Sequence, residues 1–257
     1  MTNDAFLDYV PVEQARAMSG LRVAFVRGVP GVWGIAIKAI LDMKGIEYIA
    51  VPHEPGGANL LLKEWTGQTS APVAMFNDDR PRPHWSEMLA LAEQLQPEPP
   101  LIPENEDERM AMFGLCHEIC SEDGFGWNLR LLLLSANDTT VDERSNALRA
   151  KYRSPVSNDY ARRRVSAIIS SLAGVLDRQT IEGKRYFMGD NLTAADIYWA
   201  AFSNLLVPMA ENLCTMPDFV RDTGLFAQRL LETPLPQILL DHRDYVVREH
   251  FRIPIAF

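Results

Sequence analysis

Cys116, His117 and Cys120 are the residues whose types and spacing most directly suggest chemistry, because thiolate and imidazole groups are zinc ligands. Their spacing places all three on one side of a helix. Three ligands without a second cluster fall short of a closed structural zinc site. Unpaired cysteines are also usually buried. We therefore expect a buried helix face here and no metal site.

The segment Ser70-Ala71-Pro72-Val73 lies at the start of an expected strand, Pro72 to Phe76. A proline at this position cannot donate a hydrogen bond to a neighbouring strand. A cis peptide bond between Ala71 and Pro72 would turn the carbonyl and amide of Ala71 outward, where an extended ligand could pair with them. Most bonds before proline are trans, so the motif alone indicates an edge strand.

A third local pattern is Asn191-Leu192-Thr193-Ala194-Ala195-Asp196-Ile197. Thr193 can accept from the amide of Asp196 while that carboxylate reaches back to the amide of Thr193, which forms a capping box at a helix start. Leu192 and Ile197 are placed as a hydrophobic staple. This pattern predicts a folding device with no part in chemistry.

The elements that position these groups change in type along the chain. Leu21 to Val26 and Ile46 to Val51 are short apolar runs typical of buried strands, and the residues between them have helical spacing, ending near Gly45. Strand, helix and strand imply a parallel pair. Pro72 to Phe76 and Pro81 to His84 flank a polar turn and predict an antiparallel hairpin, and helical spacing resumes from Glu87 to Leu95.

Four prolines within residues 97–103 forbid a helix and mark a domain boundary. Beyond them the strand signal disappears. A helix is expected from near Glu104, and a second helical face runs from Val165 to Leu176. Asp138 to Asn158 is polar and contains Ser154-Pro155, which predicts a loop or a broken helix. The second part of the chain is therefore expected to be a helical bundle.

Composition narrows the classes of function. The 257 residues are 47% hydrophobic and 23% charged, which is typical of a globular protein of one large or two small domains. A net charge of -9 disfavours nucleic acid and anionic lipid as partners. Three cysteines suit a reducing compartment. With no apolar segment long enough for a signal peptide or a membrane span, the cytoplasm is the expected location.

The order of these features resembles the glutathione transferase superfamily. Gly189 to Asp196 carries the resemblance most specifically, and Ser70 to Val73 follows. The resemblance implies an N-terminal extension (1–20), an α/β thioredoxin-like domain that binds glutathione (21–96), a proline-rich linker (97–103) and an all-helical domain with the pocket for the second substrate (104–257). It also implies a homodimer, with glutathione as cosubstrate.

The resemblance implies a set of glutathione contacts, and the chain departs from part of it. Members pair the γ-glutamyl end of glutathione with an acidic residue followed by serine. Glu87 matches the acid and Met88 replaces the serine, so that only the amide of Met88, at a helix N-terminus, is left to bind a carboxylate. Glu87 could instead serve only the helix dipole, but the resemblance favours the contact with glutathione. The remaining implied contacts are Gln68, Ser70, Ala71 and Pro72.

The larger departure follows the first strand. Members place a tyrosine, serine or cysteine here to stabilise the glutathione thiolate, but residues 27–34 contain none of these. Backbone amides near the start of the helix or the guanidinium of Arg27 could substitute, or the loop could serve only as a turn. The resemblance therefore implies a catalytic region but no single catalytic residue. That region comprises Arg27, Gly28, Val29, Gly31 and Trp33. Tyr9 could supply a hydroxyl from the extension.

The acceptor pocket implied by the resemblance is apolar and includes Trp33, His117, Trp127 and Arg130. Residues 124–128 are expected to be a loop beside it. The first hypothesis is thus an enzyme that directs the thiolate of glutathione at a hydrophobic electrophile. The second is a binding or assembly protein that has lost the catalytic residue. A thiol-disulfide oxidoreductase is a third, disfavoured because all three cysteines follow the linker.

Overall fold

The buried run Leu21–Val26 is strand β1, as the sequence predicts, and it lies at the centre of a sheet of order β2-β1-β3 in this computed structural model. β1 pairs in parallel with β2 (Ile49–His53) and antiparallel with β3 (Val73–Phe76). Val23 lies opposite Ala50 on one side and Ala74 on the other. The structure describes residues 7–136, 143–231 and 234–257.

The strand predicted at Ile46 to Val51 begins later, at Ile49, because the preceding residues close a helix. Gly45 has a φ of 64°, the left-handed conformation that glycine adopts without strain. The amides of Gly45 and Ile46 donate to the carbonyls of Asp42 and Leu41 at 3.2 and 2.9 Å. This is the Schellman pattern of helix ends, so the chain can become a strand only after it.

The predicted hairpin is present in reduced form. Ala74 and Arg82 exchange both backbone hydrogen bonds, at 3.1 and 2.8 Å, as an isolated antiparallel bridge. Pro81 and Pro83 flank Arg82 and lack the N–H groups needed to extend the pairing. The segment Pro81 to His84 is therefore held against β3 at one residue and does not form a full strand.

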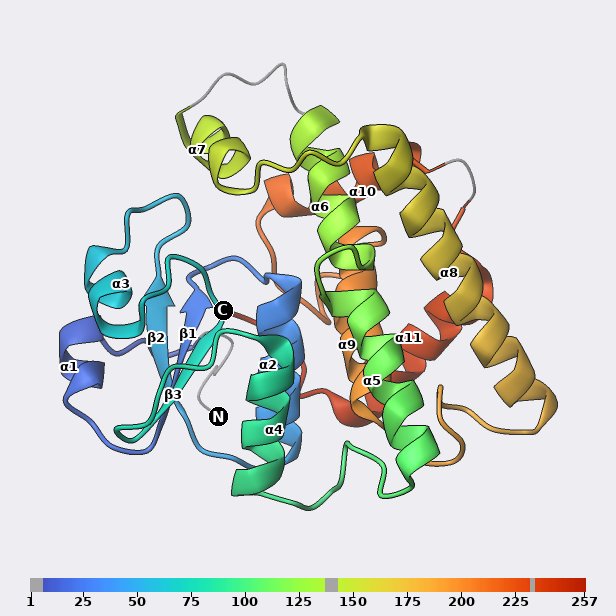
Figure 1. The fold of residues 1–257 in the computed structure, drawn as a ribbon, viewed down its shortest axis with the longest axis horizontal. Helices are drawn as coiled ribbons and strands as arrows, with labels where there is room; N and C mark the ends of the chain where they lie inside the picture. Colours follow the sequence, from blue (N-terminus) through green and yellow to red (C-terminus); the bar gives the residue numbers. More distant parts are fainter. Residues whose placement is uncertain (1–6, 137–142, 232–233) are drawn as a thin grey trace. The chain divides into compact units, whose positions relative to one another are not determined.

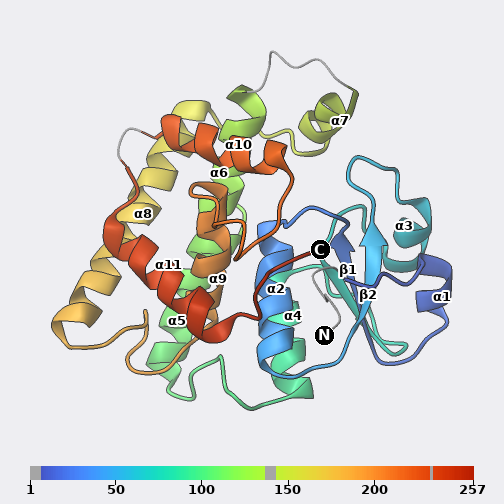
Figure 2. The same cartoon turned by 180° about the vertical axis from the view of Figure 1, so that it is seen from behind.

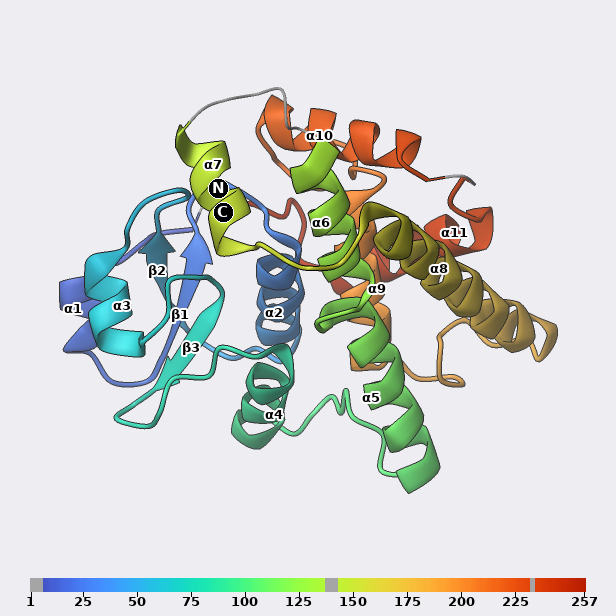
Figure 3. The ribbon, with the colours of Figure 1, turned by 45° about the horizontal axis from the view of Figure 1, so that its top comes forward.

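Two pairs of helices cover the two faces of the sheet (Figures 1 and 3). α2 (Val32–Met43) and α4 (Trp85–Leu95) lie on one face, and both were expected from the sequence. α1 (Val12–Arg16) and α3 (Leu60–Thr66) lie on the other face and were not expected. A small core joins this second pair to the sheet. It contains Ala15, Ala24, Val51, Leu62, Val73 and Met75.

The chain divides into two compact units, and the division differs from the predicted boundaries. The N-terminal unit contains residues 1–100 together with 209–217 and 248–257, and the helical unit contains residues 101–208 and 218–247. Within the N-terminal unit, Cys214 forms a parallel bridge with Ile255. The ring of Phe257 packs edge-on against Phe25 at 5.5 Å. Parts of the predicted helical domain therefore complete the N-terminal core.

The helical unit is built around one helix that is buried on all sides. Every residue of α9 (Ala194–Phe202) is buried, and α5 packs against it (Figure 2). Such a helix belongs at the centre of a core. The remaining helices are α5 (Glu106–Cys120), α6 (Phe125–Ala136), α7 (Glu143–Lys151), α8 (Asn158–Ile181), α10 (Asp218–Arg229) and α11 (Gln237–His250), with a short 3-10 turn η1 (Ser203–Leu205).

One sequence prediction about this unit needs correction. Residues 125–128 begin α6 and are not a loop. Gly124 precedes them in a turn so tight that a β-carbon there would meet the carbonyl oxygens of Glu118 and Ser121 at 2.8 Å. The segment predicted as a loop or broken helix, Asp138 to Asn158, contains the short helix α7 between α6 and α8, which agrees with a broken helix; its residues 138–142 lie outside the described part.

The predicted capping box is confirmed at the start of α9. The amide and hydroxyl of Thr193 both donate to Oδ2 of Asp196 at 2.8 Å. The other oxygen of Asp196 accepts from the amide of Phe187 and from Nε2 of His242, a partner that the sequence did not indicate. Within the described residues, no helix is long and apolar enough to cross a membrane.

Candidate functional site

Glu87 lies in the first turn of α4, where the sequence placed it. Its Oε1 accepts from Nη1 of Arg80 at 2.7 Å. Its Oε2 is buried and has no hydrogen-bond partner among the described residues. Partial burial works to raise the pKa of Glu87, but the hydrogen bond and charge of Arg80 outweigh it and lower the pKa below 4.5. Glu87 is therefore an ionised carboxylate with one oxygen paired and one oxygen unpaired.

The role predicted for Met88 is wrong. Its amide donates to the carbonyl of His84 at 3.1 Å, which closes the first turn of α4, so this amide is not available to a ligand. Its side chain is 3% exposed and belongs to the core. Arg80 is the charged group that the sequence reasoning missed. It comes from the turn before the helix, and helical spacing gives no information about such a turn.

The segment before β3 is held by its neighbours. The amide of Gln68 donates to Oγ1 of Thr66 at 3.1 Å, and His53 is hydrogen-bonded through Nε2 to the carbonyl of Thr69 at 3.0 Å. The peptide bond between Ala71 and Pro72 is cis. None of the hydrogen bonds among the described residues uses the backbone amide or carbonyl of Ala71. Ser70, Ala71 and Pro72 are all half-buried.

The loop after β1 is a turn followed by a helix start. Gly28 has a φ of 66°, a left-handed conformation in which any residue with a side chain would be strained. The amide of Gly31 donates to the carbonyl of Val29 at 2.8 Å, and α2 begins at Val32. The first turn of a helix carries backbone amides without intrahelical partners. Arg27 is paired with Glu54 at 3.2 Å, so its charge is partly compensated.

Tyr9 lies at this same loop. The N-terminal extension runs beside β2, where Tyr9 forms a parallel bridge with Ala50. The ring of Tyr9 faces the guanidinium of Arg27, 5.3 Å from its centre. The hydroxyl is buried without a partner among the described residues. Burial raises the pKa of Tyr9 to about 12, with Glu54 adding to the rise and Arg27 opposing it. The phenol therefore stays protonated at neutral pH and can donate a hydrogen bond.

The residues expected in an acceptor pocket are only partly brought together. Within the helical unit, the guanidinium of Arg130 lies over the rings of Trp127 and Tyr152, at 5.0 and 4.5 Å. His117 is exposed on α5 and does not join this group. Trp33 belongs to the N-terminal unit, at the start of α2.

The cysteines behave as core residues. Cys116, Cys120 and Cys214 are all buried, and the thiol of Cys116 donates to the sulfur of Met112 at 3.5 Å. Burial raises the pKa of Cys116 and Cys120 well above the ordinary value. His117 is exposed, whereas its two neighbours in the motif are buried. Across the described ranges, no group of three His, Cys, Asp or Glu residues could hold a metal ion.

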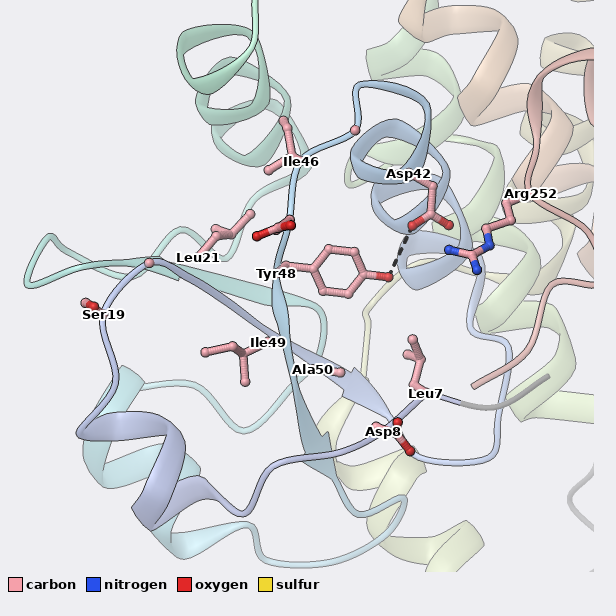
Figure 4. A pocket seen from close by; sticks show the side chains of 13 residues that line it. Leu7, Asp8, Ser19, Leu21, Asp42, Ile46, Tyr48, Ile49, Ala50 and Arg252 are labelled. Carbon is pink, nitrogen blue, oxygen red and sulfur yellow. Dashed lines mark hydrogen bonds between the residues drawn. The ribbon is translucent and has the colours of Figure 1, made fainter. Parts of the chain in front are cut away.

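A separate cavity of about 740 Å³ lies in the N-terminal unit where β1 and β2 begin (Figure 4). Tyr48 projects across it and donates to Oδ1 of Asp42 at 3.4 Å, and Arg252 lies beside them. Asp8 and Glu47 add two more carboxylates to its lining. None of the site residues predicted from the sequence lines this cavity. Its position at the start of β1 separates it from the loop that follows the end of that strand.

Comparisons with known proteins identify the architecture. No protein-family model matches the chain, and no curated protein sequence matches it. Solved structures do match. A glutathione S-transferase from Methylobacterium radiotolerans, in complex with glutathione sulfonate, has a TM-score of 0.62 and 18% identity over 93% of this chain and 96% of its own. The chain has the glutathione transferase fold.

Other glutathione transferase folds match over a similar span. A glutathione S-transferase from Methylobacillus flagellatus with glutathione bound has a TM-score of 0.64 at 11% identity, covering 93% of this chain and all of its own. A β-etherase from Sphingobium has a TM-score of 0.56 at 18% identity, covering 86% and 98%. The mixed sheet with helices and the all-helical part that the sequence predicted are thereby confirmed as the architecture of this fold.

Proposed function

We propose that this protein binds reduced glutathione in its N-terminal unit and directs the thiolate at a hydrophobic electrophile. The observation that supports the proposal most is the unpaired Oε2 of Glu87 beside the Arg80 ion pair. A buried carboxylate oxygen without a partner costs free energy that a ligand donor would recover. Two of the similar structures hold glutathione or its sulfonate, which supports the same ligand here.

The pair of Glu87 and Arg80 suits the amino-acid end of glutathione. The γ-glutamyl group carries an ammonium and a carboxylate on one carbon. The ammonium would donate to Oε2 of Glu87, and the carboxylate would accept from the guanidinium of Arg80, whose side chain is 63% exposed. Arg80 would thus supply the carboxylate contact that the resemblance assigned to the serine position. The pair stays charged at neutral pH, because the pKa of Glu87 is lowered.

The cysteinyl part of glutathione would pair with the backbone of Ala71, whose amide and carbonyl make no hydrogen bond within the described residues. An extended peptide pairs readily with such an unoccupied backbone edge. Gln68 and Ser70 lie on the same segment and would reach the remaining polar groups of the tripeptide. Pro72 would shape this edge without donating to it.

The thiol would be activated without a cysteine or serine after β1. Backbone amides in the first turn of α2 favour an anion. The hydroxyl of Tyr9 would donate one further hydrogen bond to the thiolate. Arg27 contributes less than the sequence suggested, because Glu54 compensates its charge. Trp127 and Arg130, which lie together in the helical unit, remain the proposed acceptor residues, whereas exposed His117 does not join them.

The second candidate is a non-catalytic binding protein of the same fold. Residues 27–34 contain no tyrosine, serine or cysteine, which favours this candidate. It differs from the enzyme in one measurable way. An enzyme lowers the pKa of the bound glutathione thiol, whereas a protein that only binds glutathione leaves that pKa near its value in water.

Calorimetric titration of Glu87→Gln with reduced glutathione tests the binding proposal. We expect affinity to fall roughly 10- to 100-fold, because a charge-assisted hydrogen bond contributes about 1.5–3 kcal/mol. The free energy of unfolding in urea should change by less than about 1 kcal/mol. Glu64→Gln is the matched control, since Glu64 forms an exposed ion pair with Arg16. An unchanged affinity for Glu87→Gln would refute the assignment of Glu87.

A further inference from the structure

The side chain of Asn128, in the first turns of α6, has an oxygen without a hydrogen-bond partner among the described residues. Its Nδ2 donates to Oδ1 of Asp123 at 3.2 Å and to the carbonyl of Gly124 at 3.0 Å. Both partners are acceptors, so the orientation of the amide is fixed and the remaining atom is the oxygen. Asn128 is 1% exposed, and its Oδ1 is buried with no partner among the described residues. A hydrogen-bond donor at this point would remove a desolvation cost.

Asn128 lines a cavity of about 480 Å³ within the helical unit, which we call the α6–α8 cavity. The wall beside Asn128 is apolar and is formed by Trp127 and Leu131 of α6 and by Val156 of the segment before α8. The ring of Trp127 is held in place edge-on against Tyr152 at 5.9 Å, with Arg130 over both rings. An apolar wall with one convergent polar atom is typical of a site for a small molecule.

The charged side of the cavity presents acceptors. Asp123 accepts from the hydroxyl of Tyr160 at 3.0 Å and from Nε of Arg164 at 3.3 Å. Exposed Glu122 adds a second carboxylate to the lining. Arg164 is also paired with Glu118 at 2.6 Å, so its charge is compensated. An anionic ligand would meet two carboxylates here and would be disfavoured, whereas a neutral ligand with a donor would not.

We infer that the α6–α8 cavity binds a small uncharged aromatic molecule that carries a hydroxyl donor, of which a phenol is the simplest. Its ring would lie against Trp127, Leu131 and Val156, and its hydroxyl would donate to Oδ1 of Asn128. The inference deepens the acceptor part of the proposed function and rests on it for the role of the ligand. Binding itself is tested without glutathione, so failure of either proposal can be recognised separately.

The test compares three probes, phenol, toluene and benzoate, by following the NMR signals of the side-chain amide of Asn128 and of the indole of Trp127. We expect phenol to bind about tenfold tighter than toluene, since a net buried hydrogen bond contributes about 1 kcal/mol. Benzoate should bind more weakly than either. Equal affinities for phenol and toluene would overturn the inference, because they would mean that water already satisfies Asn128.

Two variants locate the site. Asn128→Ala should abolish the preference for phenol over toluene while leaving toluene binding unchanged. Val156 lines the cavity and is 37% exposed, so Val156→Arg can place a charge there without loss of folding. This variant should weaken the binding of both phenol and toluene at least tenfold. If Val156→Arg left phenol binding unchanged, the ligand would lie elsewhere and the inference would be wrong. This second variant keeps the test valid should Asn128→Ala fold poorly.

Discussion

At the scale of single residues, Glu87 is an ionised carboxylate in the first turn of α4, with one oxygen paired to Arg80 and the other without a hydrogen-bond partner among the described residues. Glu87 could be placed because helical spacing fixes the start of α4. Met88 could not serve as expected, because its amide closes the first turn onto His84. Arg80 could not be predicted as a site residue, because it comes from a turn. Tyr9 was named as a possible hydroxyl donor, but its position could not be predicted, because the path of the extension depends on tertiary packing.

The buried thiols give a prediction at this scale. Burial raises the pKa of Cys116 and Cys120 well above 9, so the reactive thiolate is almost absent at neutral pH. The native protein should therefore react with an aromatic disulfide reagent only as fast as it unfolds, and denaturant should release all three thiols. A native thiol that reacts within seconds at pH 8 would contradict this expectation and would favour the hypothesis of a thiol-disulfide oxidoreductase.

Tyr9→Phe gives a second prediction. With a pKa of about 12, Tyr9 stays protonated up to at least pH 10 and can donate to a bound thiolate. Removing the hydroxyl should raise the pKa of bound glutathione by about one unit, the equivalent of about 1.4 kcal/mol. The ultraviolet absorbance of the thiolate, followed as pH rises, measures this change. An unaltered thiolate titration would show that Tyr9 takes no part in activation.

At the scale of elements, the sequence predicted those with strong local signals. β1, α2 and α4 follow from buried runs and helical periodicity. The short helices α1 and α3 were missed, because they have five and seven residues and owe their stability to packing against the sheet. The hairpin was overestimated, because Pro81 and Pro83 limit its pairing to one bridge.

The end of α2 supports a stability prediction. The side chain of Lys44 is fully buried, and Nζ donates to the carbonyls of Gln96 and Pro99 at 2.8 and 2.7 Å and pairs with Glu93 at 2.8 Å. Lys44→Met should lower the free energy of unfolding by about 3–5 kcal/mol, since it breaks the buried ion pair with Glu93 and removes the donor to two carbonyls. Urea denaturation measures the loss.

Exposed Lys63, near the end of α3, is the matched control for this lysine. Lys63→Met should change the free energy of unfolding by less than about 0.5 kcal/mol. A similar small change for Lys44→Met would show that the contacts of Lys44 with the residues after α4 do not stabilise the fold.

At the scale of the whole molecule, the chain keeps the glutathione transferase fold at 11–18% identity to the structures compared. Layered architecture survives such divergence because it depends on the pattern of buried positions more than on their identity. The places of the internal segment 209–217 and of the C-terminal segment 248–257 could not be predicted, because both join the N-terminal unit through contacts distant in sequence.

The net charge of -9 matters at this scale as well. Glutathione is an anion, so the overall field of the protein does not attract it. Under the proposed function, binding must come from local groups, which would be the Glu87 and Arg80 pair, the backbone of Ala71 and the first turn of α2. Affinity should therefore depend on these contacts and only weakly on ionic strength.

Thermal unfolding with and without reduced glutathione tests the central claim most directly. Glutathione at 100 times its dissociation constant should stabilise the protein by about 2.7 kcal/mol, with a corresponding rise in Tm. Glutathione acetylated on its amino group, which cannot donate the charged hydrogen bonds to Glu87, should give a much smaller rise at the same concentration. No rise in Tm with millimolar reduced glutathione would contradict the proposed function.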